Sequence, residues 1–433
     1  MDGHAIPHWY DPEGAGGPLT LVDGEDSTVY DDEGNAYLDF MAQLYCVNAG
    51  HSNGAIVEAM TEQASRIPYV SSAKGNDARD RLASMLVERA PASLTDVHFS
   101  VSGSEANEIA VQVARAYQDA PKVLTRWRSY HGSTYGAAAL TGDPETRAEV
   151  ERYGAASGVS KFLPPLEFGG PFPAETPEEL AEQAADHLEW VIRNEGPDSV
   201  AALITEPVAG TSGAYPAPPG YFERVREICD EYDVLLVSDE VIAGFGRCGD
   251  WFGIQTEGVE PDVITFAKGV TSAYAPLAGA LVSEEISEYL GEEGTPLGQT
   301  FAGHPVACAA GVAAVEAYEG GLFDNARDLA PTLEERLRAV ETEFDVVGDV
   351  HGRGLLWGVE FADPETGEHL FDPRVDEGDN PVAAVREEAR ERGVLFGSAR
   401  PDVQLVLSPP LCVTEAEVDE AVGTLRESIG AVF

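Results

Sequence analysis

The chain has 433 residues, of which 43% are hydrophobic, so it is long enough for a large core and two or three domains. Its 76 acidic residues against 27 basic ones give a formal net charge of −49, which would repel phosphates and disfavours nucleic acid as a partner. Five cysteines without a Cys-x-x-Cys pair and nine scattered histidines indicate neither a disulfide framework nor a metal site.

The acidic residues are spread along the whole chain, which is typical of a solvated surface and not of an acidic tail. Diffuse acidity with only four lysines resembles proteins of salt-accumulating halophiles, where salt screens the repulsion, so we expect activity at high salt. Residues 1–9 contain no basic region followed by an apolar one, and no apolar stretch is long enough to span a bilayer. These features predict a cytoplasmic protein without a membrane partner.

In chain order, the first 55 residues are expected to form short strands with turns, at 19–24 and 28–39, which contribute to a small domain. Helical patterns at 54–65, 77–90 and 104–117 then alternate with short apolar strands. The strands are predicted at 97–100, 122–125, 200–205, 234–238 and 263–266. This alternation predicts an α/β domain over residues 56–318 with a mainly parallel sheet, whose ligands bind beyond the carboxyl ends of the strands.

An insertion, two consecutive helices and a C-terminal domain complete the predicted organisation. Residues 142–177 are rich in glycine and proline and are expected to be a loop inserted in the large domain. A helix of small residues is predicted at 304–319, followed by a helix at 324–342. Residues 319–433 are expected to form a small α+β domain, with strands at 354–360 and 403–407 and helices at 382–392 and 415–429.

Lys268 follows the apolar run Asp-Val-Ile-Thr-Phe-Ala and is one of only four lysines. A run of this kind predicts a buried strand that delivers the amine into a cleft. Because burial disfavours the charged form, it lowers the pKa of a lysine and makes the amine nucleophilic. Lys268 is therefore a candidate Schiff-base lysine.

Two more candidates follow predicted strands. Ser-Gly-Ser-Glu-Ala-Asn at 102–107 opens a helix, whose N-terminus either binds a phosphate or is simply capped by Ser102 and Glu105. Tyr130, in Tyr-His-Gly, either stacks on a planar cofactor or packs against the protein.

Asp239 ends an apolar strand, where a buried acid requires a partner. A protonated pyridine nitrogen, a salt bridge to Arg247 and a magnesium ion are the alternatives. A phosphate anchor, an aromatic ring, an acid and Lys268 in this order together predict a cofactor site.

The chain resembles class III pyridoxal-phosphate aminotransferases from about residue 20 to the C-terminus. The resemblance is carried by Ser-Gly-Ser-Glu-Ala-Asn (102–107), Tyr-His-Gly (130–132), Glu-Pro-Val-x-Gly (206–210), Asp-Glu-Val-x-x-Gly-Phe-Gly-Arg (239–247), Thr-Phe-Ala-Lys-Gly (265–269) and Gln-Thr-Phe-x-Gly-His-Pro (299–305). Tyr-Cys-Val-Asn-Ala-Gly-His (45–51) and Leu-Ser-Pro-Pro-Leu (407–411) point to the ω-amino acid:pyruvate branch, the ω-transaminases. The resemblance implies fold type I, with a seven-stranded sheet in the large domain, and a homodimer or tetramer with shared active sites.

The resemblance also implies roles for matching positions. Lys268 carries pyridoxal 5′-phosphate as a Schiff base, and Asp239 holds the proton of the pyridine ring. The remaining matched positions surround the cofactor: Val241 and Tyr130 on the two ring faces, Gly103 and Ser104 at the phosphate, Glu206 near the ring hydroxyl, and Thr300 at the phosphate of the neighbouring subunit.

The expected reaction is a ping-pong transamination from an ω-amino acid or amine to a keto acid, with pyruvate as the acceptor and Lys268 as general base. Arg400 is the candidate for binding the substrate carboxylate, because a guanidinium pairs with a carboxylate through two bonds. The family pattern places this arginine where Gly397 stands, so a surface charge is the alternative interpretation of Arg400. Tyr45 replaces a tryptophan that is common in the branch and would make the substrate pocket more polar.

Three alternative functions stay open. An acetylornithine or 4-aminobutyrate aminotransferase would use 2-oxoglutarate as its acceptor. An aminomutase or racemase of the same fold, such as glutamate-1-semialdehyde aminomutase, would need no separate keto acid. A non-catalytic scaffold would be expected to lack Lys268 or Asp239, and both are present.

Overall fold

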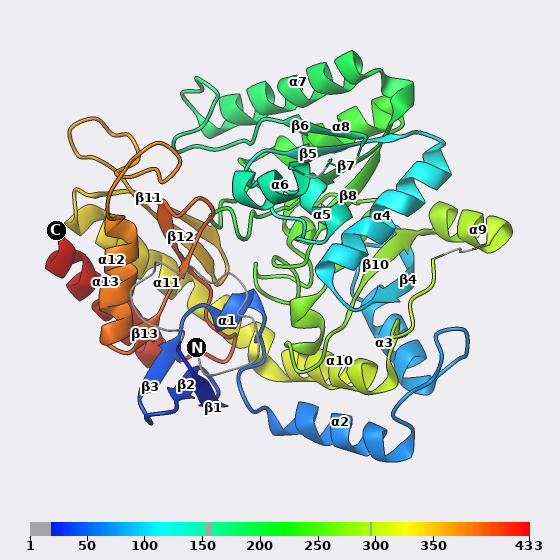
Figure 1. The fold of residues 1–433 in the computed structure, drawn as a ribbon, viewed down its shortest axis with the longest axis horizontal. Coiled ribbons are helices and arrows are strands. Elements are labelled where there is room, and N and C mark those ends of the chain that lie inside the picture. Colours follow the sequence, from blue (N-terminus) through cyan, green and yellow to red (C-terminus); the bar gives the residue numbers. More distant parts are fainter. Residues whose placement is uncertain (1–18, 153, 155–156, 295–296) are drawn as a thin grey trace.

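The largest sheet of the computed structural model, which describes residues 19–433 except 153, 155–156 and 295–296, has seven strands in the order β4-β10-β9-β8-β7-β5-β6 (Figure 1). Strand β10 runs antiparallel to both of its neighbours, and the other strands run parallel to one another. The mainly parallel α/β fold is thereby confirmed. The strands are β4 (Leu94–Ser100), β5 (Lys122–Arg126), β6 (Val159–Phe162), β7 (Val200–Thr205), β8 (Leu235–Asp239), β9 (Val263–Phe266) and β10 (Ala278–Ser283).

Both faces of this sheet are apolar, because successive residues of a strand point to opposite sides. Val237 and Val263 pack in one cluster with α4 (Gly103–Gln118) and α9 (Glu284–Glu293). On the opposite face Leu236 lies in a cluster with α7 (Pro177–Glu195) and α8 (Tyr221–Tyr232). Strands buried on both faces have continuous apolar sequences, which explains why the central strands are visible in the sequence.

The prediction of a plain loop at 142–177 is wrong. This segment contains helix α6 (Pro144–Glu151) and the edge strand β6, which pairs only with β5 within the described residues. Asp143 caps α6 by accepting a hydrogen bond from the backbone N–H of Thr146 at 2.9 Å. The strand was hidden because Val-Ser-Lys-Phe is short and half polar, as edge strands often are.

Two smaller sheets join segments that lie far apart in the chain. The first has the order β1-β2-β3-β13, in which the N-terminal strand β3 runs parallel to the C-terminal strand β13. The second has the order β11-β12-β15-β14. The domain boundaries near residues 55 and 318 stay predictions. The strands are β1 (Leu21–Glu25), β2 (Thr28–Asp31), β3 (Ala36–Asp39), β11 (Val347–Arg353), β12 (Leu356–Phe361), β13 (Val394–Leu395), β14 (Gly397–Ser398) and β15 (Gln404–Leu407).

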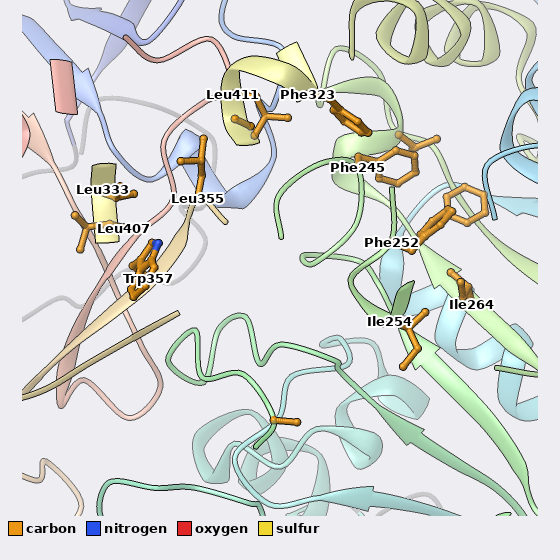
Figure 2. Close-up of a cluster of buried hydrophobic side chains, with 14 of the residues drawn as sticks. Phe245, Phe252, Ile254, Ile264, Phe323, Leu333, Leu355, Trp357, Leu407 and Leu411 are labelled. Atoms are coloured by element: carbon orange, nitrogen blue, oxygen red, sulfur yellow. The ribbon is translucent and has the colours of Figure 1, made fainter. Parts of the chain in front are cut away.

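One buried cluster connects the large sheet with the smaller sheets. Figure 2 shows its side chains extending from Phe245 and Phe252, after β8, to Leu333, Trp357 and Leu407. The remaining helices surround this core. They are α1 (Ala42–Tyr45), α2 (Gly54–Arg66), α3 (Asp77–Val87), α5 (Tyr135–Leu140), α10 (Pro305–Ala317), α11 (Phe323–Glu343), α12 (Pro381–Glu391) and α13 (Glu415–Val432), with short 3-10 helices at Pro197–Ser199, Gly253–Glu257 and Lys268–Thr271 and a π-helix at Tyr318–Leu322.

The expectation that no apolar stretch is long enough to span a bilayer is wrong by length and composition for the helical stretch Pro305–Glu343, but 56% of its most apolar window is buried inside the protein. Its first part, α10, packs against α2 and α3. Gly321 interrupts the stretch with a φ of +126°, outside helical geometry. We therefore interpret Pro305–Glu343 as a core element of the folded chain.

Candidate active site

Five parallel strands, β4, β5, β7, β8 and β9, end at one edge of the large sheet, and the residues at and after their ends line a single cavity of about 220 Å³. Parallel strands present their carboxyl ends at the same edge, so residues distant in sequence meet there. The lining residues are Gly103, Ser104, Asn107, Tyr130, His131, Gly132, Ser133, Glu206, Asp239, Val241, Ile242 and Lys268. The structure thus brings together seven of the ten predicted site residues.

Lys268 begins a 3-10 turn directly after β9, and its backbone adopts a left-handed φ of +49°. Its side chain faces the cavity but is otherwise enclosed by protein. Burial lowers the pKa of its amine, and the nearby Cys46 and Asp239 oppose that shift. A larger fraction of a lysine held in this way is neutral at a given pH than of an exposed one, and only the neutral amine can act as a base or nucleophile.

Asp239 ends β8 and is held by donors on both carboxylate oxygens. Its Oδ2 lies 2.7 Å from His131 Nδ1 and accepts a hydrogen bond from Asn107 Nδ2 at 2.8 Å. Its Oδ1 accepts from the backbone N–H of Val241 at 3.0 Å. Thr265 in turn orients Asn107, because its hydroxyl donates to Asn107 Oδ1 at 2.9 Å. These bonds fix the direction in which Asp239 faces the cavity.

The alternative pairing of Asp239 with Arg247 is wrong. The guanidinium of Arg247 is fully buried elsewhere, where it donates to Asn48 Oδ1 at 2.8 Å and to the carbonyl oxygens of Leu355 and Pro409. No carboxylate is within ion-pair distance among the described residues, and burial lowers the pKa of Arg247 to about 10. Arg247 therefore joins the N-terminal segment, the large sheet and the C-terminal region.

The first turn of α4 forms one end of the cavity. Ser102 caps the helix by accepting from the N–H of Glu105 at 3.2 Å, so the predicted cap is present. The first N–H groups of the helix belong to Gly103 and Ser104. N–H groups at a helix N-terminus favour binding of an anion. Opposite them, Gly132 has a φ of +127°, and a Cβ there would lie 2.3 Å from Ser104 Oγ. Only glycine permits this close cradle.

Val241 and Tyr130 come from different loops of the cavity wall. Val241 contacts the first turn of α4, since a Cβ on Gly103 would lie 3.0 Å from both of its methyl groups. Tyr130 is held through its backbone N–H, which donates to Glu206 Oε1 at 3.2 Å. Glu206 also accepts from the N–H of Gly210 at 2.7 Å and therefore fixes two loops at once.

The other three predicted residues lie outside that cavity lining. The ring of Tyr45 is centred 5.1 Å from Lys268 Nζ, and its buried hydroxyl has no hydrogen-bond partner in the described part of the chain. The guanidinium carbon of Arg400 lies 5.7 Å from the centre of the Tyr130 ring. Thr300 is exposed and does not join the cavity in this subunit.

These residues fit pyridoxal 5′-phosphate. The N-terminus of α4 suits its phosphate, the Asp239 carboxylate suits its pyridine nitrogen, and the Lys268 amine suits its aldehyde. The unpaired hydroxyl of Tyr45 is a buried polar atom on a ring centred 5.1 Å from Lys268 Nζ. The individual roles of these residues stay predictions.

The family model described as Aminotransferase class-III matches residues 11–429. The chain belongs to the class III aminotransferases.

Individual relatives of this aminotransferase cover almost its whole length. The diaminobutyrate–2-oxoglutarate transaminase of Halomonas elongata is 36% identical over 99% of this chain and 94% of the relative. The mitochondrial gamma-aminobutyrate transaminase 1 of Oryza sativa subsp. japonica is 35% identical over 96% of this chain and 81% of the relative. Among solved structures, the taurine:2-oxoglutarate aminotransferase of Bifidobacterium kashiwanohense, in complex with PLP and glutamate, has a TM-score of 0.94 at 32% identity, covering 99% of this chain and 96% of that one. These likenesses confirm fold type I.

Sequence reasoning about this aminotransferase missed Asn107 and His131, the two side chains that hold Asp239. Both occur in motifs that were recognised, Ser-Gly-Ser-Glu-Ala-Asn and Tyr-His-Gly. The sequence could have indicated both residues, because a buried carboxylate such as Asp239 requires hydrogen-bond donors and Asn107 and His131 follow neighbouring strands.

Proposed function

We propose that this class III aminotransferase transfers the amino group of an ω-amino acid or amine to 2-oxoglutarate, with pyridoxal 5′-phosphate as its cofactor. The reaction type rests above all on one observation, the shared cavity of Lys268, Asp239 and the α4 N-terminus. The acceptor rests on two relatives whose names contain 2-oxoglutarate, the diaminobutyrate and taurine enzymes. They favour this acceptor over the pyruvate expected from the ω-transaminase motifs.

When bound, pyridoxal phosphate supplies an electron sink for the carbon that carries the amino group. Lys268 Nζ, with its pKa lowered by burial, would act as the general base that removes a proton from that carbon. The same amine would then act as the general acid that delivers a proton to the carbon of the cofactor aldehyde group. Asp239 would hold a proton at the ring nitrogen of the cofactor, and His131 and Asn107 fix the position of its carboxylate. Val241 and Tyr130 would pack against the cofactor ring.

The donor and acceptor are tested with purified enzyme loaded with pyridoxal phosphate in high salt. We expect at least one of taurine, 4-aminobutyrate, 2,4-diaminobutyrate, β-alanine and ornithine to discharge the visible absorption band of the cofactor. Addition of 2-oxoglutarate is expected to restore the band. Restoration by pyruvate alone would return the enzyme to the ω-transaminase branch, and a band that no donor changes would favour a mutase or racemase.

Arg400 is proposed to bind a carboxylate of the acceptor. Its Nη1 donates to Thr146 Oγ1 at 2.9 Å and lies 3.4 Å from Asp143 Oδ2, at the rim beside Tyr130. Burial raises the pKa of Tyr45, and the positive charge of Arg400 opposes that shift. The electrostatic field of Arg400 therefore reaches the Tyr45 hydroxyl. A guanidinium at this position can exchange its protein partners for a carboxylate.

Replacement of Arg400 by alanine is expected to raise the KM for 2-oxoglutarate by about 10- to 100-fold, the value of a charge-assisted hydrogen bond. The kcat and the KM for an amine without a carboxylate should change little. Steady-state kinetics with both substrates measure the difference. Arg386→Ala is the matched control, because Arg386 pairs with Asp402 in the same region, away from the cavity. An unchanged KM for the keto acid would identify Arg400 as a surface charge.

A homodimer is proposed as the functional form. Phe301 and Tyr69 are exposed aromatic residues whose ring centroids lie 6.1 Å apart, next to an apolar groove formed partly by Val101 and Pro276. Thr300 lies beside them and would reach the phosphate site of a second subunit. An exposed apolar surface of this kind favours a protein partner, and sedimentation of the purified enzyme checks the dimer.

A further inference from the structure

The Glu206 loop (residues 206–220) connects β7 to α8. Three of its consecutive carbonyl oxygens accept hydrogen bonds from residues outside the loop. Thr211 O accepts from the backbone N–H of Arg400 at 2.8 Å, and Ser212 O accepts from Arg128 Nη2 at 3.0 Å. The third, Gly213 O, accepts hydrogen bonds from side chains of the small sheet formed by β11, β12, β15 and β14. The loop therefore connects three elements that carry the site residues Tyr130, Glu206 and Arg400.

Gly213 O has two side-chain donors. Gln404 Nε2, on β15, donates to it at 2.6 Å, and His351 Nε2, on β11, lies 2.8 Å from it. The approach requires a glycine, because Gly213 has a φ of +130° and a Cβ would lie 2.4 Å from the Gln404 amide. The backbone of the loop is thus pressed against the small sheet at this residue.

The other ring nitrogen of His351 shows which protonation state this arrangement requires. His351 Nδ1 lies 2.7 Å from Asp349 Oδ2. A backbone carbonyl and a carboxylate both only accept hydrogen bonds, whereas a neutral imidazole has a single N–H to donate. Both contacts are satisfied together only when His351 carries two ring protons and is positively charged.

The groups around His351 favour this charge. Asp349, on its own strand, and Glu360, on β12, both raise the pKa of His351 against the lowering effect of burial, and the net shift is upward. Glu360 is itself buried, its Oε2 has no hydrogen-bond partner in the described part of the chain, and burial raises its pKa to about 7. Glu334 and Glu167 line the adjoining cavity of about 140 Å³.

Opposing charges lie further from the His351 ring. Arg338, on α11, lies 4.0 Å from Asp349 Oδ1, and Arg128, in the loop after β5, acts on Glu360 and His369. His369 Nδ1 lies 3.5 Å from Glu360 Oε2, and burial lowers the pKa of His369. The largest influences on the pKa of His351 are burial, which lowers it, and Asp349, Glu360 and the Gly213 carbonyl, which raise it.

We propose that His351, held as an imidazolium between Asp349 and Gly213, is a positioning residue that fixes the Glu206 loop against the small sheet. Through this loop it maintains the position of Arg400, and through Glu206 that of the Tyr130 backbone. Loss of one ring proton leaves a single N–H for Asp349 and Gly213 O, and so weakens the attachment of the loop, which Gln404 and Arg128 continue to contact. The proposal rests on the proposed transamination only for its effect on kinetics.

The direction of the pH dependence follows from the raised pKa. The contact stabilises the folded protein fully below the ordinary histidine pKa, about 6.5, and this stabilisation is lost as pH rises through the higher value in the folded state. We therefore expect weaker binding of the keto acid on the alkaline side, with KM affected more than kcat.

The test uses the holoenzyme labelled with carbon-13 at the histidine ring. The His351 signal, assigned by its loss in His351→Gln, is expected to show a predominantly protonated ring at pH 6.5 and a midpoint above 6.5. In Asp349→Asn the midpoint should fall by about one unit or more, because the anionic partner is gone while the histidine remains. A neutral ring at pH 6.5 in the wild type, or an unchanged midpoint in Asp349→Asn, would overturn the proposal.

Kinetics supply the second measurement. Asp349→Asn and His351→Gln are each expected to raise the KM for 2-oxoglutarate at pH 6.5, where the wild-type ring is charged, by about tenfold, the value of one hydrogen bond to a charged group, and to change kcat less. His187→Gln is the matched control, because His187 stacks on the exposed Trp190 of α7 and lies outside this network. An unchanged KM in both variants would overturn the proposed effect on the loop. Should the wild type lack transaminase activity, the ring titration still decides the charge of His351.

Discussion

Replacement of Lys268 by alanine is expected to lower kcat by at least about 10⁴-fold, the upper range for loss of a positioned acid–base group. Lys268 is the only lysine among the residues that line the cavity, and its amine also carries the cofactor in the proposed mechanism. The phosphate cradle of Gly103 and Ser104 is untouched, so the variant should still retain pyridoxal phosphate through dialysis. Single-turnover kinetics and cofactor content measure the two effects separately.

A small external amine sharpens this test. Methylamine is expected to restore part of the activity of Lys268→Ala, because the space left by the side chain admits a diffusible base. Lys122→Ala is the matched control, since Lys122 pairs with Glu195 at the start of β5, away from the cavity. Turnover of Lys268→Ala near the wild-type rate would remove the basis for the proposed mechanism.

The fold was largely predictable from the sequence where strands are buried on both faces. Strands β7, β8 and β9 have continuous apolar sequences, and the structure places them within one residue of the prediction. Strand β10 was missed because Ala-Gly-Ala-Leu-Val-Ser resembles a helical or loop segment. Its small residues are required by close packing, since a Cβ at Gly279 would lie 2.6 Å from His98 O.

The site was predictable as a set of strand-end residues, but its hydrogen bonds were not. Asn107 lies one turn inside α4, where a polar residue is ordinarily solvated, so its bond to Asp239 depends on how α4 sits over β8 and β9. Arg247 is eight residues after Asp239, yet the intervening turn carries it to Asn48. In the proposed dimer, Thr300 and the phosphate site that it would reach belong to different subunits.

The pairing of His351 with Gly213 shows a second limit of sequence reasoning. The two residues are separated by 138 positions, and neither lies in a motif with a recognisable chemical role. Only the geometry reveals that one histidine has an acceptor at each nitrogen. Charge states of buried groups are set by such three-dimensional partners and not by local sequence.

Replacement of Asp239 by asparagine is expected to lower kcat by about 10³-fold, equivalent to about 4 kcal/mol in the activation barrier. Asparagine has nearly the same shape but a single acceptor oxygen, so it can keep the bond from Val241 and loses the bond from Asn107 Nδ2. The protonation state of the ring nitrogen therefore reports the loss of the negative charge separately from kcat. The ring nitrogen is expected to titrate in the variant near neutral pH, which nitrogen-15 NMR of labelled cofactor measures directly.

The neighbouring acid supplies the control for Asp239→Asn. Glu240 is also buried, but its carboxylate accepts from the N–H groups of Gly253 and Ile254 at 2.7 Å and faces away from the cavity. Burial raises the pKa of Glu240 to about 7, so its charge contributes little to the site. Glu240→Gln should therefore lower thermal stability while kcat stays within a few-fold of the wild type. If both variants lost the same activity, or if Asp239→Asn kept a protonated ring at pH 8, the negative charge of Asp239 would not be what drives the reaction.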